Sequence, residues 1–64
     1  MNETRLRYFK HEDVLHLIIS DGQESRSIEL SPSITVELNN KNEMIGVEIL
    51  NAKEVLLDML QESL

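Results

Sequence analysis

Alternating apolar and polar residues divide most of the chain into short predicted strands. In residues 5–9, Leu6 and Tyr8 alternate with two arginines, and this period of two is typical of a half-buried strand. Residues 14–19 are rich in β-branched and aliphatic side chains and are apolar on both faces, so we expect a central strand there. The alternation returns in residues 25–30, 34–38 and 44–50.

Turn-forming residues separate these predicted strands. Asp21-Gly22 lies between two strand patterns and favours a tight hairpin, because both residues readily adopt positive φ angles. Pro32 ends the third strand, since proline cannot donate to a ladder, and residues 39–42 form a polar loop of hairpin length. Gly46 inside the last strand indicates a bulge or a close approach by a neighbouring side chain. Consecutive hairpins predict an antiparallel meander.

The period changes to that of a helix after residue 51. Asn51 is suited to the N-cap, and Glu54 follows three residues later as in a capping box. Apolar side chains cover roughly 200° of the helical wheel, about twice the arc that is needed to face a core. We expect one apolar stripe to cover the sheet of its own chain. That stripe consists of Ala52, Val55, Leu56, Met59 and Leu60.

The predicted fold class is α+β, with an antiparallel meander of about four to five strands over residues 4–50 and one amphipathic C-terminal helix over residues 52–63. The 64 residues form a single domain, residues 1–64. A core of this size rarely supplies more than about 3–5 kcal/mol, and without cysteine no disulfide or thiolate metal site supplements it. Self-association as a homodimer is therefore expected. The candidate interface is either a sheet edge or the helix, through Val55, Leu57 and Leu64; Leu57 and Leu64 extend the apolar arc beyond the stripe.

Charge narrows the classes of partner. The formal net charge is −6, which disfavours autonomous binding to nucleic acid because phosphates repel such a surface, but it allows a basic protein partner. No apolar run is long enough to span a bilayer, and the N-terminus lacks the apolar segment of a signal peptide. We expect a cytoplasmic protein without membrane contact.

Few side chains are candidates for catalysis or metal binding. His11, Asp13 and His16 are the only cluster of metal-ligand types, and they lie around one short turn without the same-face spacing of a helical histidine pair. Asp13 has an alternative structural role, because an aspartate before a strand can accept backbone N–H groups. No glycine-flanked serine or phosphate-binding loop is present. The sequence predicts a non-enzymatic protein with no catalytic residue and no cofactor, and a small metal- or ligand-binding domain stays an alternative.

Glu48 is the remaining unusual acid, because its predicted strand face also carries apolar residues. It could be a buried acid with a raised pKa, an ordinary edge residue, or the partner of a basic side chain. The candidate bases are Arg5, Arg7 and Lys53.

Three segments together resemble a known family. Residues 8–17, 29–34 and 45–52 are similar to the small prokaryotic proteins grouped as domain of unknown function 2283, and the last segment is the most specific. The resemblance covers roughly residues 8–55. Three positions depart from the family pattern: Phe9 stands where aspartate is usual, His16 where tyrosine is common, and Ser33 where the turn glycine is expected, which questions a positive φ there.

The resemblance implies a compact β-meander with a helix and no established activity. It also implies an alternative function, an antitoxin-like partner of a small basic toxin. Such a role has a physical basis, because an acidic domain can cover the basic, RNA-binding face of a small ribonuclease.

Overall fold

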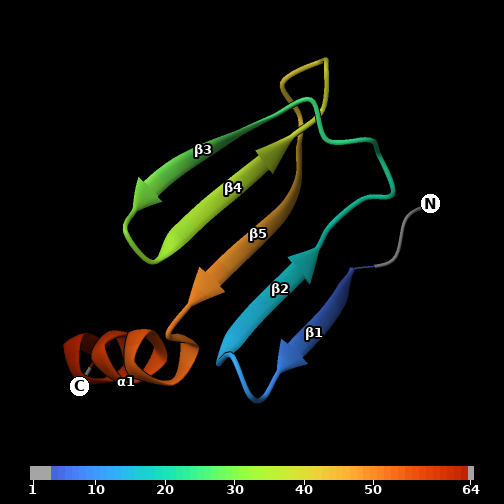
Figure 1. Ribbon diagram of the computed structural model, residues 1–64. Coiled ribbons are helices and arrows are strands. Elements are labelled where there is room, and N and C mark those ends of the chain that lie inside the picture. Colours follow the sequence, from blue (N-terminus) through green and yellow to red (C-terminus); the bar gives the residue numbers. More distant parts are fainter. Residues whose placement is uncertain (1–3, 64) are drawn as a thin grey trace.

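The computed structural model describes residues 4–63 and contains five strands followed by one helix. This confirms the α+β class and places every predicted element within one residue of its predicted bounds. Figure 1 shows the arrangement. The elements are β1 (Arg5–Phe9), β2 (Val14–Ile18), β3 (Arg26–Ser31), β4 (Ile34–Leu38), β5 (Met44–Leu50) and α1 (Ala52–Ser63).

The strand order is β1-β2-β5-β4-β3, and all pairings are antiparallel. β1 with β2, β3 with β4, and β4 with β5 form hairpins as predicted. The predicted hairpin around Asp21-Gly22 is wrong: residues 19–25 cross one end of β5 to reach the far edge of the sheet, and no described glycine has a positive φ. Along this crossing the N–H groups of Ile19 and Ser20 donate to the carbonyl of Ile45 at 2.9 and 3.2 Å.

The central position of β5 explains this departure from a simple meander. β5 pairs along its length with β2 on one side and with β4 on the other, so its backbone groups are satisfied on both edges. A strand inside a sheet forms a hydrogen-bonded ladder on both edges. A local hairpin between β2 and β3 would have used the edge of β2 with which β5 pairs. β2 is an interior strand next to the centre, rather than the central strand that its apolar faces indicated.

The predicted irregularity at Gly46 is confirmed. Glu37 pairs with Gly46, but Leu38 pairs with Met44, so the register between β4 and β5 shifts by one residue at this point. The extra residue, Ile45, is one of the three buried apolar side chains among the described residues. The bulge therefore contributes directly to a very small core, whose other members are Leu38 and Ala52.

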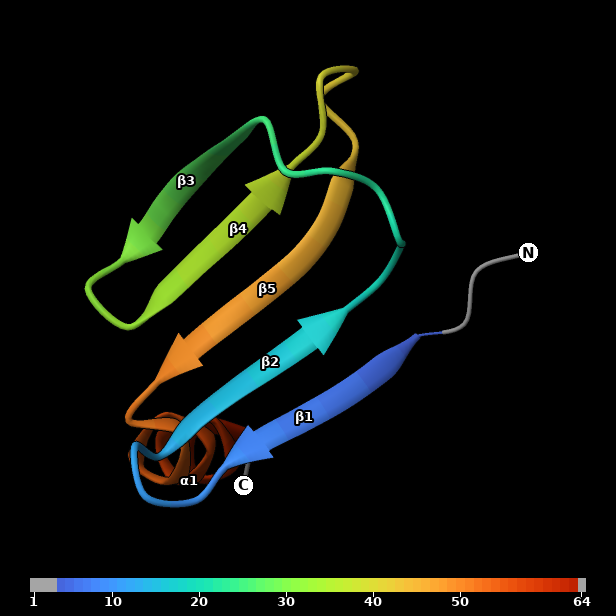
Figure 2. The same ribbon diagram turned by 45° about the vertical axis from the view of Figure 1, so that its right-hand side comes forward.

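The helix stands off the sheet instead of lying flat on it. Figure 2 looks nearly along the axis of α1 while the strands lie across the view. Only the start of the predicted apolar stripe is covered: Ala52 is 1% exposed and Val55 is half-buried, whereas Leu56, Met59 and Leu60 remain exposed. The expectation that the whole stripe covers the sheet of its own chain is therefore wrong. The single residue between β5 and α1, Asn51, has a φ of 52°, which turns the chain sharply out of the strand.

No helix in residues 4–63 has the length and apolarity that are needed to cross a membrane.

Candidate functional site

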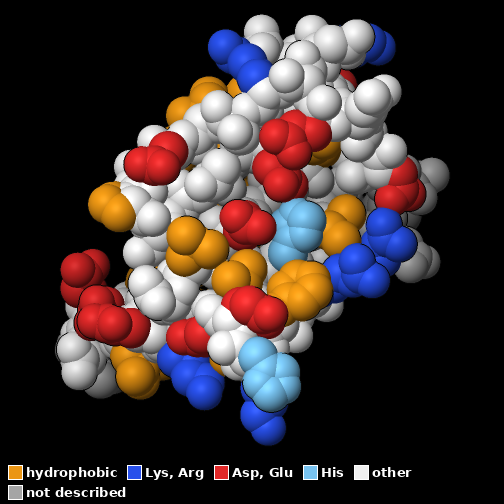
Figure 3. Space-filling model, in the orientation of Figure 1, with side chains coloured by type: hydrophobic (Ala, Val, Ile, Leu, Met, Phe, Trp, Pro, Cys, Tyr) orange, Lys and Arg blue, Asp and Glu red, His pale blue; other side chains and the backbone are white. Residues whose placement is uncertain are grey.

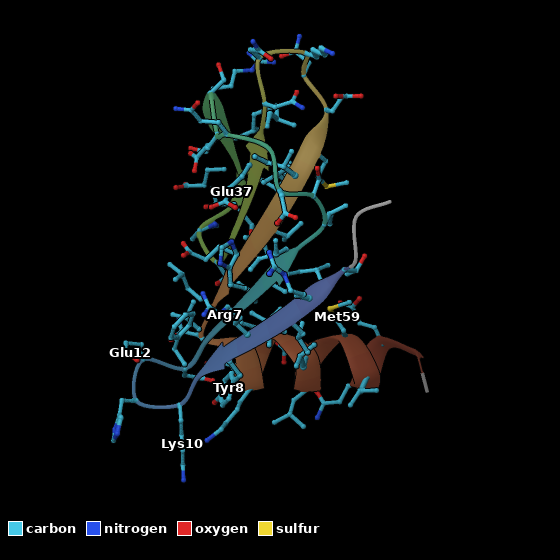
Figure 4. All side chains as sticks on the ribbon, turned by 90° about the vertical axis from the view of Figure 1, so that its right-hand side faces the viewer. Arg7, Tyr8, Lys10, Glu12, Glu37 and Met59 are labelled. Carbon is cyan, nitrogen blue, oxygen red and sulfur yellow. The ribbon has the colours of Figure 1, made fainter. Side chains whose placement is uncertain are left out.

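A row of polar side chains crosses the sheet on the face that points away from α1. Residues that oppose each other directly in neighbouring strands share a face. Figure 3 shows a histidine among acidic side chains over the middle of the sheet, and Figure 4 shows Arg7 and Glu37 on the side opposite the helix. From edge to edge the row consists of Arg7, His16, Glu48, Thr35 and Glu29.

The closest contact on this face joins two strands that are not neighbours. His16 of β2 and Glu37 of β4 lie on either side of β5, and Nε2 of the histidine is 2.9 Å from Oε1 of the carboxylate. The pair passes over Gly46 of β5, where a Cβ atom would collide with the Glu37 carboxylate and would lie 3.2 Å from the carbonyl oxygen of Leu17. Gly46 therefore creates the space that this contact needs.

Glu37 was missed as a site residue, because its strand alternates cleanly and the acid reads as an ordinary outward side chain. The signal that pointed to it was Gly46, for which a close approach by a neighbouring side chain was one prediction. That prediction is confirmed. The pair is partly shielded, with 26% of the His16 side chain and 21% of the Glu37 side chain exposed.

A shallow hollow of about 340 Å³ lies beside this pair. Its walls combine two apolar residues, Ile18 and Ile45, with acidic side chains. Asp21 on its rim accepts a hydrogen bond from Nη2 of Arg5 at 2.6 Å, an exposed ion pair of the kind that contributes little to stability. The hollow is open to solvent, and Ser20 also lines it.

A second polar cluster lies on the helix side. The Tyr8 hydroxyl donates to Oδ1 of Asp13 at 2.8 Å, and the same carboxylate accepts the backbone N–H of Lys53 in the first turn of α1 at 3.2 Å. The Asp13 carbonyl accepts the N–H of Ala52 at 3.0 Å. The hydrogen bond to Asp13, together with some desolvation and the charge of that carboxylate, raises the pKa of Tyr8 above its ordinary value.

This cluster corrects the predicted helix cap. Asn51 occupies the N-cap position, since its carbonyl accepts the N–H of Val55 at 3.1 Å. Its side chain does not cap the helix, and the hydrogen-bonding carboxylate comes from Asp13 instead. Asp13 adopts a φ of 55°, a left-handed conformation that aspartate tolerates better than most residues.

The predicted metal-ligand residues are not brought together. Asp13 is directed at Tyr8 and the helix, His16 faces Glu37 on the other side of the sheet, and His11 lies exposed in the turn between β1 and β2. Within residues 4–63, no group of three or more metal-ligand side chains is close enough to hold an ion.

Glu48 lies half-buried in the centre of the polar row, opposite His16. The ion pairs found in the described part of the chain join Arg5 to Asp21 and His16 to Glu37, so Glu48 has no basic partner there. Of the predicted interface residues, Val55 is half-buried, Leu57 is 58% exposed, and Leu64 lies outside the described residues.

Comparison with known proteins gives one match. No curated protein and no solved structure matches the chain. The model of one family, described as "Protein of unknown function (DUF2283)", matches residues 5–53. This span covers all five strands and the start of α1, including the Asp13, Gly46 and Glu37 positions that shape both polar clusters. The chain therefore belongs to the DUF2283 family of proteins of unknown function.

Proposed function

We propose that this chain is a non-catalytic interaction module that works as a homodimer. The observation that carries the proposal is the distribution of its apolar side chains. Three apolar residues are buried in the described part of the chain, whereas many large ones are exposed. The exposed residues on the helix and on the strand face beside it are Leu6, Tyr8, Leu56, Leu57, Met59 and Leu60.

The total surface area supports the same proposal. A compact folded protein of 7.4 kDa exposes about 4,200 Å², whereas this chain exposes 5198 Å². The excess of about 1,000 Å² is comparable to the roughly 800 Å² that each partner buries in a stable protein–protein interface. The Cα radius of gyration, 12.6 Å, also exceeds the value of about 10.7 Å that is expected for a compact domain of this length. Both quantities support the proposal that a second copy packs against the exposed apolar surface.

The polar clusters support a non-catalytic role, because their contacts have structural explanations. The Asp13 carboxylate caps α1, and the His16–Glu37 pair bridges strands across Gly46. A second hollow, of about 490 Å³, lies between residues 22–25 and the loop after β4. The side chain of Asn39 in that loop is already hydrogen-bonded within the loop, since its Oδ1 accepts the N–H groups of Lys41 and Glu43.

The molar mass in solution tests the proposal. Sedimentation equilibrium at micromolar concentrations is expected to give twice the chain mass of 7.4 kDa. A mass of one chain at every concentration would contradict the homodimer.

A second candidate function is an antitoxin-like partner for a small basic protein. The charge gradient of the polar face favours it: Arg7 lies at the β1 edge, while Glu48 and Glu29 follow towards the β3 edge. Acidic side chains on an uncovered face can steer a basic protein towards it. Co-purification with the product of a small basic neighbouring gene, reduced by Glu48→Lys and unaffected by Leu57→Gln, is the expected result. Equal co-purification of both variants would contradict this use of the polar face.

A further inference from the structure

We infer that the two copies of this chain pair through one flank of α1, with the two helices antiparallel and Leu57 of each copy opposite Leu60 of the other. The inference rests on the proposed homodimer and specifies which surface forms its centre. The partner that covers this flank is a second copy of the same chain.

The helix carries two different apolar stripes. The first begins at Ala52, which is buried, and Val55, which is half-buried, and Met59 continues it; Figure 4 shows Met59 on the side of α1 that faces β1. At 100° per residue, Leu57 and Leu60 lie to one side of this stripe. They are the two most exposed leucines of the helix, at 58% and 61%. The sheet of the same chain therefore cannot cover this flank.

The spacing along the flank is that of a helix–helix contact. Residues 53, 57, 60 and 64 follow the alternating steps of four and three that keep side chains on the seam between two paired helices. Lys53 begins this series, the two exposed leucines form its middle, and Leu64, which lies outside the described residues, continues it. The helix from Ala52 to Ser63 is long enough to carry both leucines on successive turns.

Charge selects the direction of the pair. Parallel helices would place Lys53 of one copy against Lys53 of the other at the start of the seam, and like charges at such positions repel. Antiparallel helices place each lysine near the C-terminal end of the other helix, where the backbone dipole is negative and favours a cation. The same arrangement opposes the two helix dipoles and crosses the helices midway between Leu57 and Leu60.

The amount of exposed surface supports a second copy of the chain as the partner of this flank. The scaling of surface area with mass gives the area that a compact protein of this mass exposes. This chain exposes about 1,000 Å² more than that. A two-fold symmetric contact buries the same patch on both copies, so one helix flank serves both subunits. The polar side of α1, with Glu54 and Asp58, then stays in solvent.

Introduced cysteines test the arrangement, because the natural chain contains none. A disulfide forms only where the two Cα atoms are within about 7 Å. Leu57→Cys mixed with Leu60→Cys is expected to give a mixed disulfide dimer as the main oxidised product. Lys53→Cys alone should give little dimer, since a rise of about 1.5 Å per residue separates the two sites by about 16 Å in an antiparallel pair. Glu54→Cys, on the solvent side, is the matched control.

The outcomes distinguish this inference from the proposed function. Each variant is first checked by sedimentation under reducing conditions. A non-covalent dimer whose Leu57 and Leu60 cysteines react no more than the Glu54 control would overturn the helix pairing and leave the homodimer intact. Preferential oxidation of Lys53→Cys would overturn the antiparallel direction. A monomer in the unmodified chain would overturn both proposals.

Discussion

The carboxylate of Asp13 accepts the backbone N–H of Lys53, forty residues further along the chain, at 3.2 Å. A turn between two strands thus supplies the cap for the C-terminal helix. The backbone of Asp13 adds a second contact, because its carbonyl accepts the N–H of Ala52. These two bonds fix the start of α1 at the end of the sheet. The helix projects from that point with most of its large apolar side chains exposed to solvent.

Replacing Asp13 with alanine should destabilise the fold by about 2 kcal/mol. A lost N-cap costs roughly 0.5–2 kcal/mol, and an alanine held at positive φ costs about 1 kcal/mol more. Asp13→Asn is the matched control, since asparagine tolerates this conformation and retains an acceptor oxygen. Urea unfolding at fixed protein concentration measures both. Equal losses for the two variants would argue against the capping role.

Tyr8→Phe should remove a pH-dependent part of the stability. Because the pKa of Tyr8 is raised in the folded state, its contribution is fully present below the unfolded value near 10 and is lost as pH rises through the folded pKa. The difference in Tm between the natural chain and Tyr8→Phe should therefore be constant at neutral pH and disappear in strong alkali. Tyr8 is the only tyrosine, so the ultraviolet absorbance of the phenolate reports its titration directly. A midpoint at or below 10 would contradict the hydrogen bond to Asp13.

Gly46→Ala should destabilise the protein through the side chain of Glu37. The added Cβ collides with the Glu37 carboxylate and crowds the Leu17 carbonyl, and such overpacking costs about 1–3 kcal/mol. In a Glu37→Ala background the first collision is absent, so the same substitution should cost less. A double-mutant cycle by urea unfolding measures the difference. Additive effects would show that Glu37 does not lie over Gly46.

Leu6→Gln and Arg7→Gln should affect dimerisation differently, although the two residues are neighbours. Leu6 is 64% exposed on the face beside the helix, and Arg7 points to the opposite face. Burying a leucine side chain is worth about 1.5–3 kcal/mol, so Leu6→Gln should raise the dissociation constant at least about tenfold if this face is buried in the dimer. Sedimentation velocity compares the two. A larger effect of Arg7→Gln would place the interface on the polar face.

Local patterns were sufficient to predict the elements of this fold. The alternation of Ile34, Val36 and Leu38 located β4, and the change of period after Asn51 located α1. The strand order was not predictable in the same way. It depends on β5 returning to pair with β2, a contact between distant segments, and the Asp21-Gly22 pair carries a local hairpin signal that this contact overrides.

The polar clusters, too, were predictable only where a local pattern indicated them. Gly46 indicated a close approach, but no pattern within β4 singled out Glu37, because its reach to His16 depends on which strand lies between them. Asp13 was identified as a residue with a hydrogen-bonding role, whereas its partner Lys53 was not, since the end of the sheet brings the two together only after folding. The apolar surplus of the helix at Leu57 was visible in the sequence because helical periodicity alone reveals it.

The dependence of the melting temperature on protein concentration tests whether this chain folds as a homodimer. In the proposed homodimer, a subunit with three buried apolar side chains in its described part gains stability from its partner, and mass action then couples folding to concentration. We expect a Tm that rises by several degrees over about two orders of magnitude in concentration. A Tm that stays constant over that range, with cooperative unfolding, would contradict it.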